Sequence, residues 1–164
     1  PFVGSCLGRR RPCGTPRPAR EGREAVPVIH LDTSFLIRAL LPGSPEDASL
    51  RGWLRRGAPV GANAVVWAEL LCGPLTAREA ELARLVVGEP VPLRGDDAAL
   101  AASLYNATGR RRGALADCMV AAAAIRSEAE LATANEADVA RFVPLGLRLV
   151  PAEPVRPAGS HRRK

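Results

Sequence analysis

Lysine is almost absent from this sequence, and its absence excludes several kinds of enzyme. Lys164, the last residue, is the only lysine among the 23 basic residues, and all the others are arginines. Phosphate-loop nucleotide hydrolases, Schiff-base enzymes and receiver-type phosphoacceptors need a lysine inside the folded domain. We therefore expect the chain to belong to none of these classes.

Cysteine and histidine are scarce, and apolar runs are short. The 4 cysteines contain no C-x-x-C pair, and there are only 2 histidines. This pattern predicts neither a zinc site nor a disulfide framework. No stretch approaches the roughly 18 uninterrupted apolar residues of a membrane span, and the N-terminal region lacks the apolar segment of a signal peptide. We expect a cytoplasmic protein with no membrane partner.

The excess of positive charge lies near the two ends of the chain. The net charge is +6 and the pI is about 10.1. Residues 1–27 hold six arginines against two glutamates, and residues 151–164 hold four basic residues against one glutamate. The segment 28–150 holds thirteen arginines and fourteen acids. The high pI therefore does not by itself indicate a nucleic-acid-binding domain.

Composition divides the chain into one domain and two tails. Residues 1–27 are rich in Pro, Gly and Arg, and residues 151–164 combine Pro with basic residues, so neither segment can bury enough apolar surface to order itself. We expect both to be disordered and residues 28–150 to fold. Because the chain begins with Pro1 and its only methionine is Met119, we hypothesise that Val28 is the natural start.

Short apolar runs alternate with helical patterns between residues 28 and 150. This alternation predicts an α/β fold, with a parallel sheet sandwiched between helices. The expected strands cover residues 26–31, 60–62, 91–93, 131–133 and 147–150. The expected helices cover residues 34–41, 44–56, 65–72, 76–87, 96–108, 116–128 and 136–142.

Acidic residues occur where this topology would bring them together. Asp32 follows the first strand, Glu69 lies in an apolar helix, Asp117 opens another, and the polar segment 133–138 follows a strand. Open α/β sheets bind ligands at the carboxyl ends of their strands. The alternatives are structural: helix capping by Asp32, burial of Glu69 beside an arginine, dipole complementarity for Asp117, and turn capping in 133–138.

Several carboxylates that share a small site need a cation between them. Oxygen ligands favour Mg²⁺ or Mn²⁺, and the chain has no cluster of Cys or His that would favour a softer metal. A metal held by carboxylates can activate a water and neutralise the charge that builds on a phosphate. The acids therefore predict hydrolysis of a phosphodiester bond.

The chain also carries four motifs in one order: LDTSFLI at 31–37, AELLCG at 68–73, LADCMVAAAA at 115–124 and LATANEAD at 131–138. Together they resemble the PIN-domain ribonucleases, and within that family the VapC toxins of bacterial toxin–antitoxin pairs. Each motif alone is weak, and the four in register span residues 28–150. The resemblance implies a sheet of about five strands.

The resemblance also implies a set of site residues. Asp32 and Asp117 would be direct metal ligands, and Glu69 would bind a second ion or orient water. The family's fourth acidic position falls on the neutral Asn135, and Asp138 would assist through water. Hydrogen bonds that orient ligands or phosphate would come from Thr33, Ser34 and Thr133.

RNA contact is expected from Arg110, Arg111 and Arg112, which precede the 116–128 helix. The rest of the domain is too acidic to hold a polyanion by itself. A solvated charged loop is the alternative interpretation.

The partners follow from the resemblance. It implies a single-strand-selective endoribonuclease that leaves a 5′-phosphate, a small VapB-type antitoxin as partner, and a homodimer. Trp53, Leu54 and Trp67 are candidates for the antitoxin surface, with core packing as the alternative.

Three other functions fit parts of the pattern. A housekeeping PIN nuclease for RNA maturation would have the same fold and site, and an inactive PIN scaffold would bind RNA or protein without cutting. A haloacid-dehalogenase-like phosphatase also has Asp followed by Thr after its first strand. That family requires a second Asp two residues after the first, where this chain has Ser34.

Overall fold

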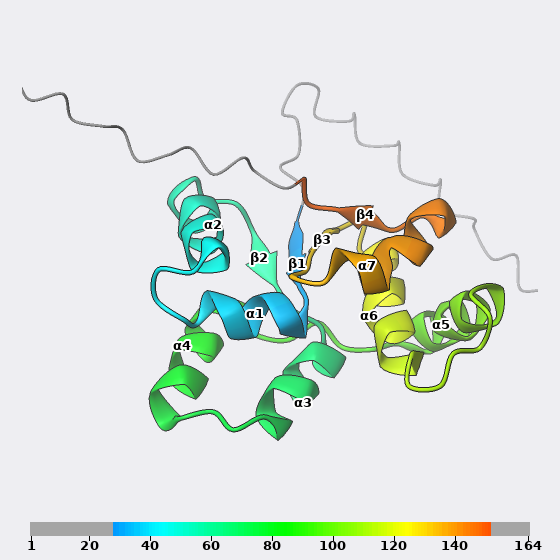
Figure 1. The fold of residues 1–164 in the computed structure, drawn as a ribbon, viewed down its shortest axis with the longest axis horizontal. Helices are drawn as coiled ribbons and strands as arrows, with labels where there is room; N and C mark the ends of the chain where they lie inside the picture. The colour runs from blue at the N-terminus through cyan, green and yellow to red at the C-terminus, as the bar shows by residue number, and fades with distance from the viewer. Residues whose placement is uncertain (1–27, 152–164) are drawn as a thin grey trace, which may run out of the picture.

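The computed structural model describes residues 28–151, and both expected tails lie outside this range except for Pro151. Four strands form one parallel sheet in the order β2-β1-β3-β4. Figure 1 shows the sheet in the centre of the fold, with α2 and α4 on the left and α5 and α6 on the right. The strands are β1 Ile29–Leu31, β2 Val60–Gly61, β3 Glu130–Ala132 and β4 Arg148–Leu149.

Strand β1 lies inside the sheet and determines where its carboxyl edge falls. Ile29 pairs with Val60 of β2, and Leu31 pairs with Ala132 of β3. All of β1 is buried, as expected for a parallel strand covered on both faces by helices. The ladder continues one residue further, because the Asp32 N–H donates to the Ala132 carbonyl at 2.8 Å. Asp32 therefore lies at the carboxyl edge of the sheet.

The strand expected over residues 91–93 is wrong, which leaves four strands where about five were expected. Only Val91 pairs, in a bridge with Asn63. Its N–H donates to the Ala62 carbonyl at 2.9 Å, and its own carbonyl accepts from the Ala64 N–H at 2.8 Å. Val91 lies between Pro90 and Pro92, which have no N–H to extend the ladder.

Seven α-helices and one 3₁₀ helix, η1, surround the sheet within the described residues. The first six helices begin and end within two residues of the predicted ranges. The helices are α1 Thr33–Ala39, α2 Pro45–Arg55, α3 Ala64–Cys72, α4 Ala77–Val87, α5 Gly95–Ala107, α6 Leu115–Arg126, α7 Glu136–Val139 and η1 Ala140–Leu145.

Capping residues explain why the helix starts are readable from the sequence. Ser44 precedes α2 and accepts from the Asp47 N–H at 2.9 Å, with Pro45 at the first helical position. Thr76 and Glu79 form a reciprocal capping box at the start of α4. These contacts satisfy N–H groups that have no partner inside the helix.

The last predicted helix, over residues 136–142, is instead the short α7 followed by η1. Pro144 lies inside η1. It has no N–H for the Ala140 carbonyl, and it disfavours the α conformation at Val143. A regular α-helix therefore cannot continue through this segment.

The core lies between the sheet and the helices. Leu31, Leu36 and Leu70 are completely buried, together with Phe142 of η1. Helix α6 contributes Cys118 and a run of buried alanines, whose small side chains allow close contact with α5 and β3. No helix within residues 28–151 is long and apolar enough to cross a membrane.

The three apolar residues considered as a partner surface have different environments. Trp53 is buried and its ring stacks on Phe35, with 5.2 Å between the ring centroids. Trp67 packs partly buried against the core beneath the guanidinium of Arg84. Leu54 is exposed. Core packing therefore accounts for Trp53, and Leu54 remains on the surface.

Candidate functional site

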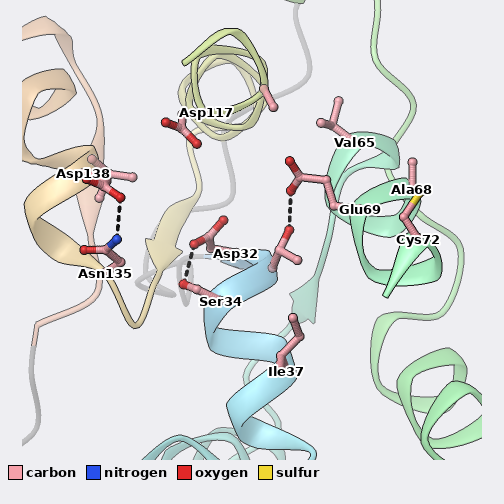
Figure 2. Close-up of a pocket in the computed structure, with 13 residues that line it drawn as sticks. Asp32, Ser34, Ile37, Val65, Ala68, Glu69, Cys72, Asp117, Asn135 and Asp138 are labelled. Carbon is pink, nitrogen blue, oxygen red and sulfur yellow. Dashed lines mark hydrogen bonds between the residues drawn. The ribbon is translucent and has the colours of Figure 1, made fainter. Parts of the chain in front are cut away.

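A cavity of about 650 Å³ opens at the carboxyl edge of the sheet. In Figure 2, Asp32, Glu69 and Asp117 approach it from three different elements, with Asn135 and Asp138 on the α7 side. The cavity thus brings together every acid predicted for the site. Its other polar lining residues are Thr33, Ser34 and the exposed thiol of Cys72.

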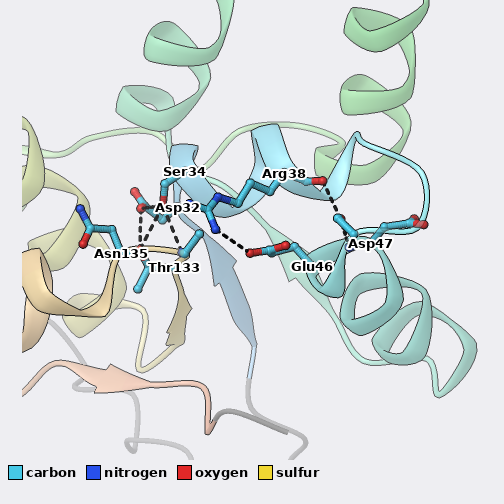
Figure 3. A network of polar contacts seen from close by, with 9 residues as sticks. Asp32, Ser34, Arg38, Glu46, Asp47, Thr133 and Asn135 are labelled. Atoms are coloured by element: carbon cyan, nitrogen blue, oxygen red, sulfur yellow. Dashed lines mark hydrogen bonds and ion pairs between the residues drawn. The ribbon is translucent and has the colours of Figure 1, made fainter. Parts of the chain in front are cut away.

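Asp32 occupies the N-cap position of α1, but its side chain makes no capping hydrogen bond. Its Oδ2 instead accepts from the Ser34 hydroxyl at 2.7 Å and from the Thr133 hydroxyl at 2.8 Å, as Figure 3 shows. Each hydroxyl has one proton, so both protons are committed to Asp32. Each hydroxyl oxygen also accepts a backbone N–H: Ser34 from Ala134 at 3.1 Å, and Thr133 from Asn135 at 3.0 Å. The capping interpretation does not explain this network.

Glu69 lies on the exposed face of α3, whose buried residues are Val66 and Leu70. Its Oε2 accepts from the Thr33 hydroxyl at 2.5 Å. The alternative interpretation, in which Glu69 is buried beside an arginine, is wrong, because Glu69 is exposed and bonds Thr33. Its apolar neighbours do not bury it, because Ala68 and Cys72 are exposed at the cavity and Leu71 is exposed as well.

Asp117 lies in the first turn of α6 and is bound by Arg141 of η1. The Arg141 Nη2 donates to its Oδ2 at 2.8 Å. Burial raises the pKa of Asp117 above its usual 3.8, Arg141 opposes this shift, and the Asp32 and Asp138 carboxylates add to it. The first-turn position suits the helix dipole, but the pKa shift shows that carboxylate neighbours also act on this residue.

Asn135 and Asp138 complete the α7 side of the cavity. The Asn135 side-chain amide donates to Asp138 Oδ2. Asn135 is at the N-cap position of α7, yet its side chain makes no capping bond. The polar segment therefore places an amide and a carboxylate at the cavity as well as forming a turn.

The three principal acids share one arrangement. Asp32, Glu69 and Asp117 are each held through a single oxygen by a donor from the protein, which leaves the other oxygen free of these bonds. Such outer contacts orient carboxylates toward a ligand. This is a donor set of carboxylate oxygens, the chemistry that suits Mg²⁺ or Mn²⁺. No group of three Asp, Glu, His or Cys side chains in the described part of the chain forms a closed metal site. A metal at this cavity would therefore be held by one or two carboxylates and by water, as is usual for Mg²⁺.

Arg110, Arg111 and Arg112 lie outside the cavity, on the loop between α5 and α6. All three are exposed. The Arg110 Nε donates to Asn106 Oδ1 at 2.9 Å, and the Arg110 backbone is left-handed, with φ of 53°. The structure therefore separates these arginines from the acids while placing them on the loop that leads into the Asp117 helix.

Sequence reasoning missed Arg141. A signal was present, because Arg141 is the only basic residue between positions 127 and 147 and lies three positions after Asp138. Periodicity predicted a helix there but not which way its arginine points. Only the packing of η1 shows that the guanidinium reaches Asp117.

Comparison with known proteins assigns the family. The PIN domain matches residues 29–142. The chain belongs to the PIN-domain family, whose members are nucleases. No curated protein matches the chain.

Solved structures share the fold. VapBC2 from Rickettsia felis, bound to a DNA fragment from its promoter, has a TM-score of 0.62 at 16% identity, covering 75% of this chain and 97% of that one. FitAcB from Neisseria gonorrhoeae has a TM-score of 0.57 at 21% identity, covering 76% and 97%. A toxin–antitoxin complex from Klebsiella pneumoniae has a TM-score of 0.55 at 21% identity, covering 68% and 90%. These TM-scores show a common fold, and at identities below 25% they show the fold alone.

Proposed function

We propose that this chain is a Mg²⁺- or Mn²⁺-dependent endoribonuclease of the VapC type, the toxin of a type II toxin–antitoxin pair. The observation that carries the proposal is the cavity at the sheet edge, where Asp32, Glu69 and Asp117 each keep one oxygen free. Membership of the PIN-domain family supports a nuclease. The four motifs and the likeness to VapBC2 support the toxin.

In this proposal Asp32 and Asp117 are metal ligands, and Glu69 binds a second ion or orients the attacking water. When bound, the metal would activate a water and neutralise charge on the phosphate. Ser34 and Thr133 keep Asp32 in one orientation, and Thr33 does the same for Glu69. These hydroxyls reduce the entropy that the carboxylates would lose on binding an ion.

Asn135 and Asp138 have subordinate roles. Asn135 is neutral where the family has a fourth acid, so it adds no charge for a second ion. Its bond to Asp138 holds that carboxylate at the cavity wall. Asp138 assists through water.

The RNA strand would reach the cavity past the loop that carries Arg110, Arg111 and Arg112. Residues 28–150 hold about as many acids as arginines, so affinity for a polyanion requires a local basic segment. Exposure of all three arginines supports this role. Their contribution would weaken steeply with salt, whereas cleavage chemistry would not.

The protein partner in this proposal is a VapB-type antitoxin, and the toxin forms a homodimer. Similar solved structures include a VapBC assembly and a toxin–antitoxin complex. The exposed Leu54 and Leu82, on α2 and α4, offer apolar surface for such contacts.

The test is cleavage of a mixed RNA pool with Mg²⁺ or Mn²⁺ by the wild type, Asp32→Asn and Asp117→Asn. Both variants should lose more than the roughly 10- to 100-fold typical of groups that only orient ligands. Glu81→Gln is the matched control, because this acid is exposed on α4 outside the cavity. Equal cleavage by the wild type and both Asn variants contradicts the site. No cleavage by any protein favours the inactive scaffold.

A further inference from the structure

Arg141 contacts Asp117, one of the acids that line the cavity. Its guanidinium binds Asp117, but Arg141 does not line the cavity. Only 17% of its side chain is exposed, against 44% for Asp117. The arginine is therefore less accessible to solvent than the carboxylate that it binds.

Arg141 is held by its hydrogen bond to Asp117 and by packing on Phe142. Its guanidinium carbon lies 4.6 Å from the centroid of the Phe142 ring, which is completely buried. Its Nε is buried without a hydrogen-bond partner. An unpaired buried donor lowers the stability of the folded state. Hydrogen bonding of the guanidinium therefore does not by itself explain its position. Its contact of functional consequence is the one with Asp117.

The charge of Arg141 acts on a group of acids. Arg141 donates to Asp117 at 2.8 Å, and Asp32 and Asp138 line the same cavity as Asp117. A fixed positive charge behind the acids stabilises them when no other cation is present. The same charge repels a divalent cation that enters from the open side.

We propose that Arg141 is the internal counter-cation of the acid cavity: it balances the carboxylates while the metal is absent, and it lowers their affinity for Mg²⁺ or Mn²⁺. This inference rests on the proposed function, since it takes Asp117 to be a metal ligand. Arg141 is a positioning residue that acts through Asp117. A purely structural role would have the opposite effect, because loss of the anchor would loosen Asp117 and weaken metal binding.

The experiment is calorimetric titration of Mn²⁺ into the full chain and its variants. Arg141→Gln removes the charge, and Arg141→Met removes it while keeping an unbranched stem against Phe142. Both should bind Mn²⁺ about tenfold more tightly than the wild type, because a unit charge near a divalent ion is lost. Arg141→Lys keeps the charge and should bind as the wild type does. Arg55→Gln, an exposed α2 arginine, controls for net charge.

A second readout on the same proteins is the rise in Tm on adding Mn²⁺. It should be larger for the two neutral variants, because tighter binding stabilises the folded state more. If one neutral variant fails to fold, the other carries the comparison. Asp117→Asn should lose the binding, which assigns the titrated site to the cavity.

The outcomes separate the inference from the proposed function. Unchanged or weaker Mn²⁺ binding in the neutral variants overturns the inference, and so does tightening by Arg141→Lys equal to that by Arg141→Gln. In both cases the wild type still binds the metal, so the proposed function stands. Absence of Mn²⁺ binding in the wild type and in every variant contradicts the metal site itself and the inference with it.

Discussion

Helix α6 carries an ion pair at each end, and the two pairs differ in what surrounds the acid. At the C-terminal end, Arg126 donates to Asp97 of α5, whose side chain is 0% exposed. At the N-terminal end, Arg141 donates to Asp117, whose side chain is 44% exposed. One acid is enclosed between two helices, and the other faces the cavity.

The pKa values of the two acids shift in opposite directions. Burial opposes ionisation of Asp97, but the hydrogen bonds from Arg126 and from the Arg94 N–H, with the charges of both arginines, lower its pKa below 3.8. Burial raises the pKa of Asp117, and the Asp32 and Asp138 carboxylates raise it further. Together they outweigh Arg141, which lowers it. An arginine partner alone therefore does not decide the direction of the pKa shift. Burial opposes ionisation of both acids, but Asp97 has two hydrogen-bond donors and two arginine charges, whereas Asp117 has one arginine and two neighbouring carboxylates.

The largest effect on stability is expected at the enclosed pair. Asp97→Asn should lower the free energy of unfolding by about 3 kcal/mol, because it removes a fully buried carboxylate and leaves the part-buried Arg126 charge uncompensated. Asp96→Asn, the exposed neighbour on α5, should cost about 0.5 kcal/mol or less. Urea denaturation measures both. Equal losses would show that Asp97 gains nothing from its enclosure.

Removing the acid of the more exposed pair, Arg141 and Asp117, should change the free energy of unfolding in the opposite direction. The pKa of Asp117 is higher in the folded than in the unfolded state. Ionisation of Asp117 therefore lowers the stability of the folded state at pH values above the folded pKa. This loss disappears as the pH falls below the folded pKa towards the unfolded one. At pH 7, Asp117→Asn should therefore raise the free energy of unfolding although Arg141 loses a charged partner, because burial, Asp32 and Asp138 together outweigh Arg141 in the pKa of Asp117. We expect a gain of about 0.5 kcal/mol, since solvent screens a half-exposed group.

Unfolding measured across pH checks the signs of both shifts. The gain from Asp117→Asn should vanish as the pH approaches 3.8, because wild-type Asp117 is then protonated. The deficit of Asp97→Asn should persist down to that pH and shrink only below it, because the folded pKa of Asp97 is lowered. A gain at Asp117 that grows on acidification would contradict the assigned direction.

The smallest effect is expected at the surface pair of Arg38 and Glu46, drawn in Figure 3. Its two charged atoms are 3.4 Å apart, and the Arg38 side chain is 58% exposed. Arg38→Ala should change the free energy of unfolding by only about 0.3 kcal/mol, and less in high salt. Thermal denaturation at two salt concentrations checks this baseline. If Arg38→Ala lost as much free energy of unfolding as Asp97→Asn, exposure to solvent would not explain why the two ion pairs differ in their contribution to stability.

The sequence predicted the helix ends better than the short strands. Caps such as Ser44 and Thr76 act within one turn of chain, so their effect is visible locally. A strand exists only if neighbours pair with it, and Pro90 and Pro92 reduced one predicted strand to the single bridge at Val91. The two prolines are visible in the sequence, but whether a segment pairs depends on neighbouring strands that are distant in the chain.

The sequence by itself determined the parallel α/β pattern, the order of the four motifs and the acids that the topology would gather at one edge. These features follow from apolar periodicity and from the position of Asp32 directly after a strand. Only the tertiary structure decided that Glu69 is exposed, that Asp32 is bound by two hydroxyls, and that Arg141 binds Asp117. Those contacts join residues far apart in the chain, and their geometry depends on how α1, α3, α6 and η1 pack around the sheet.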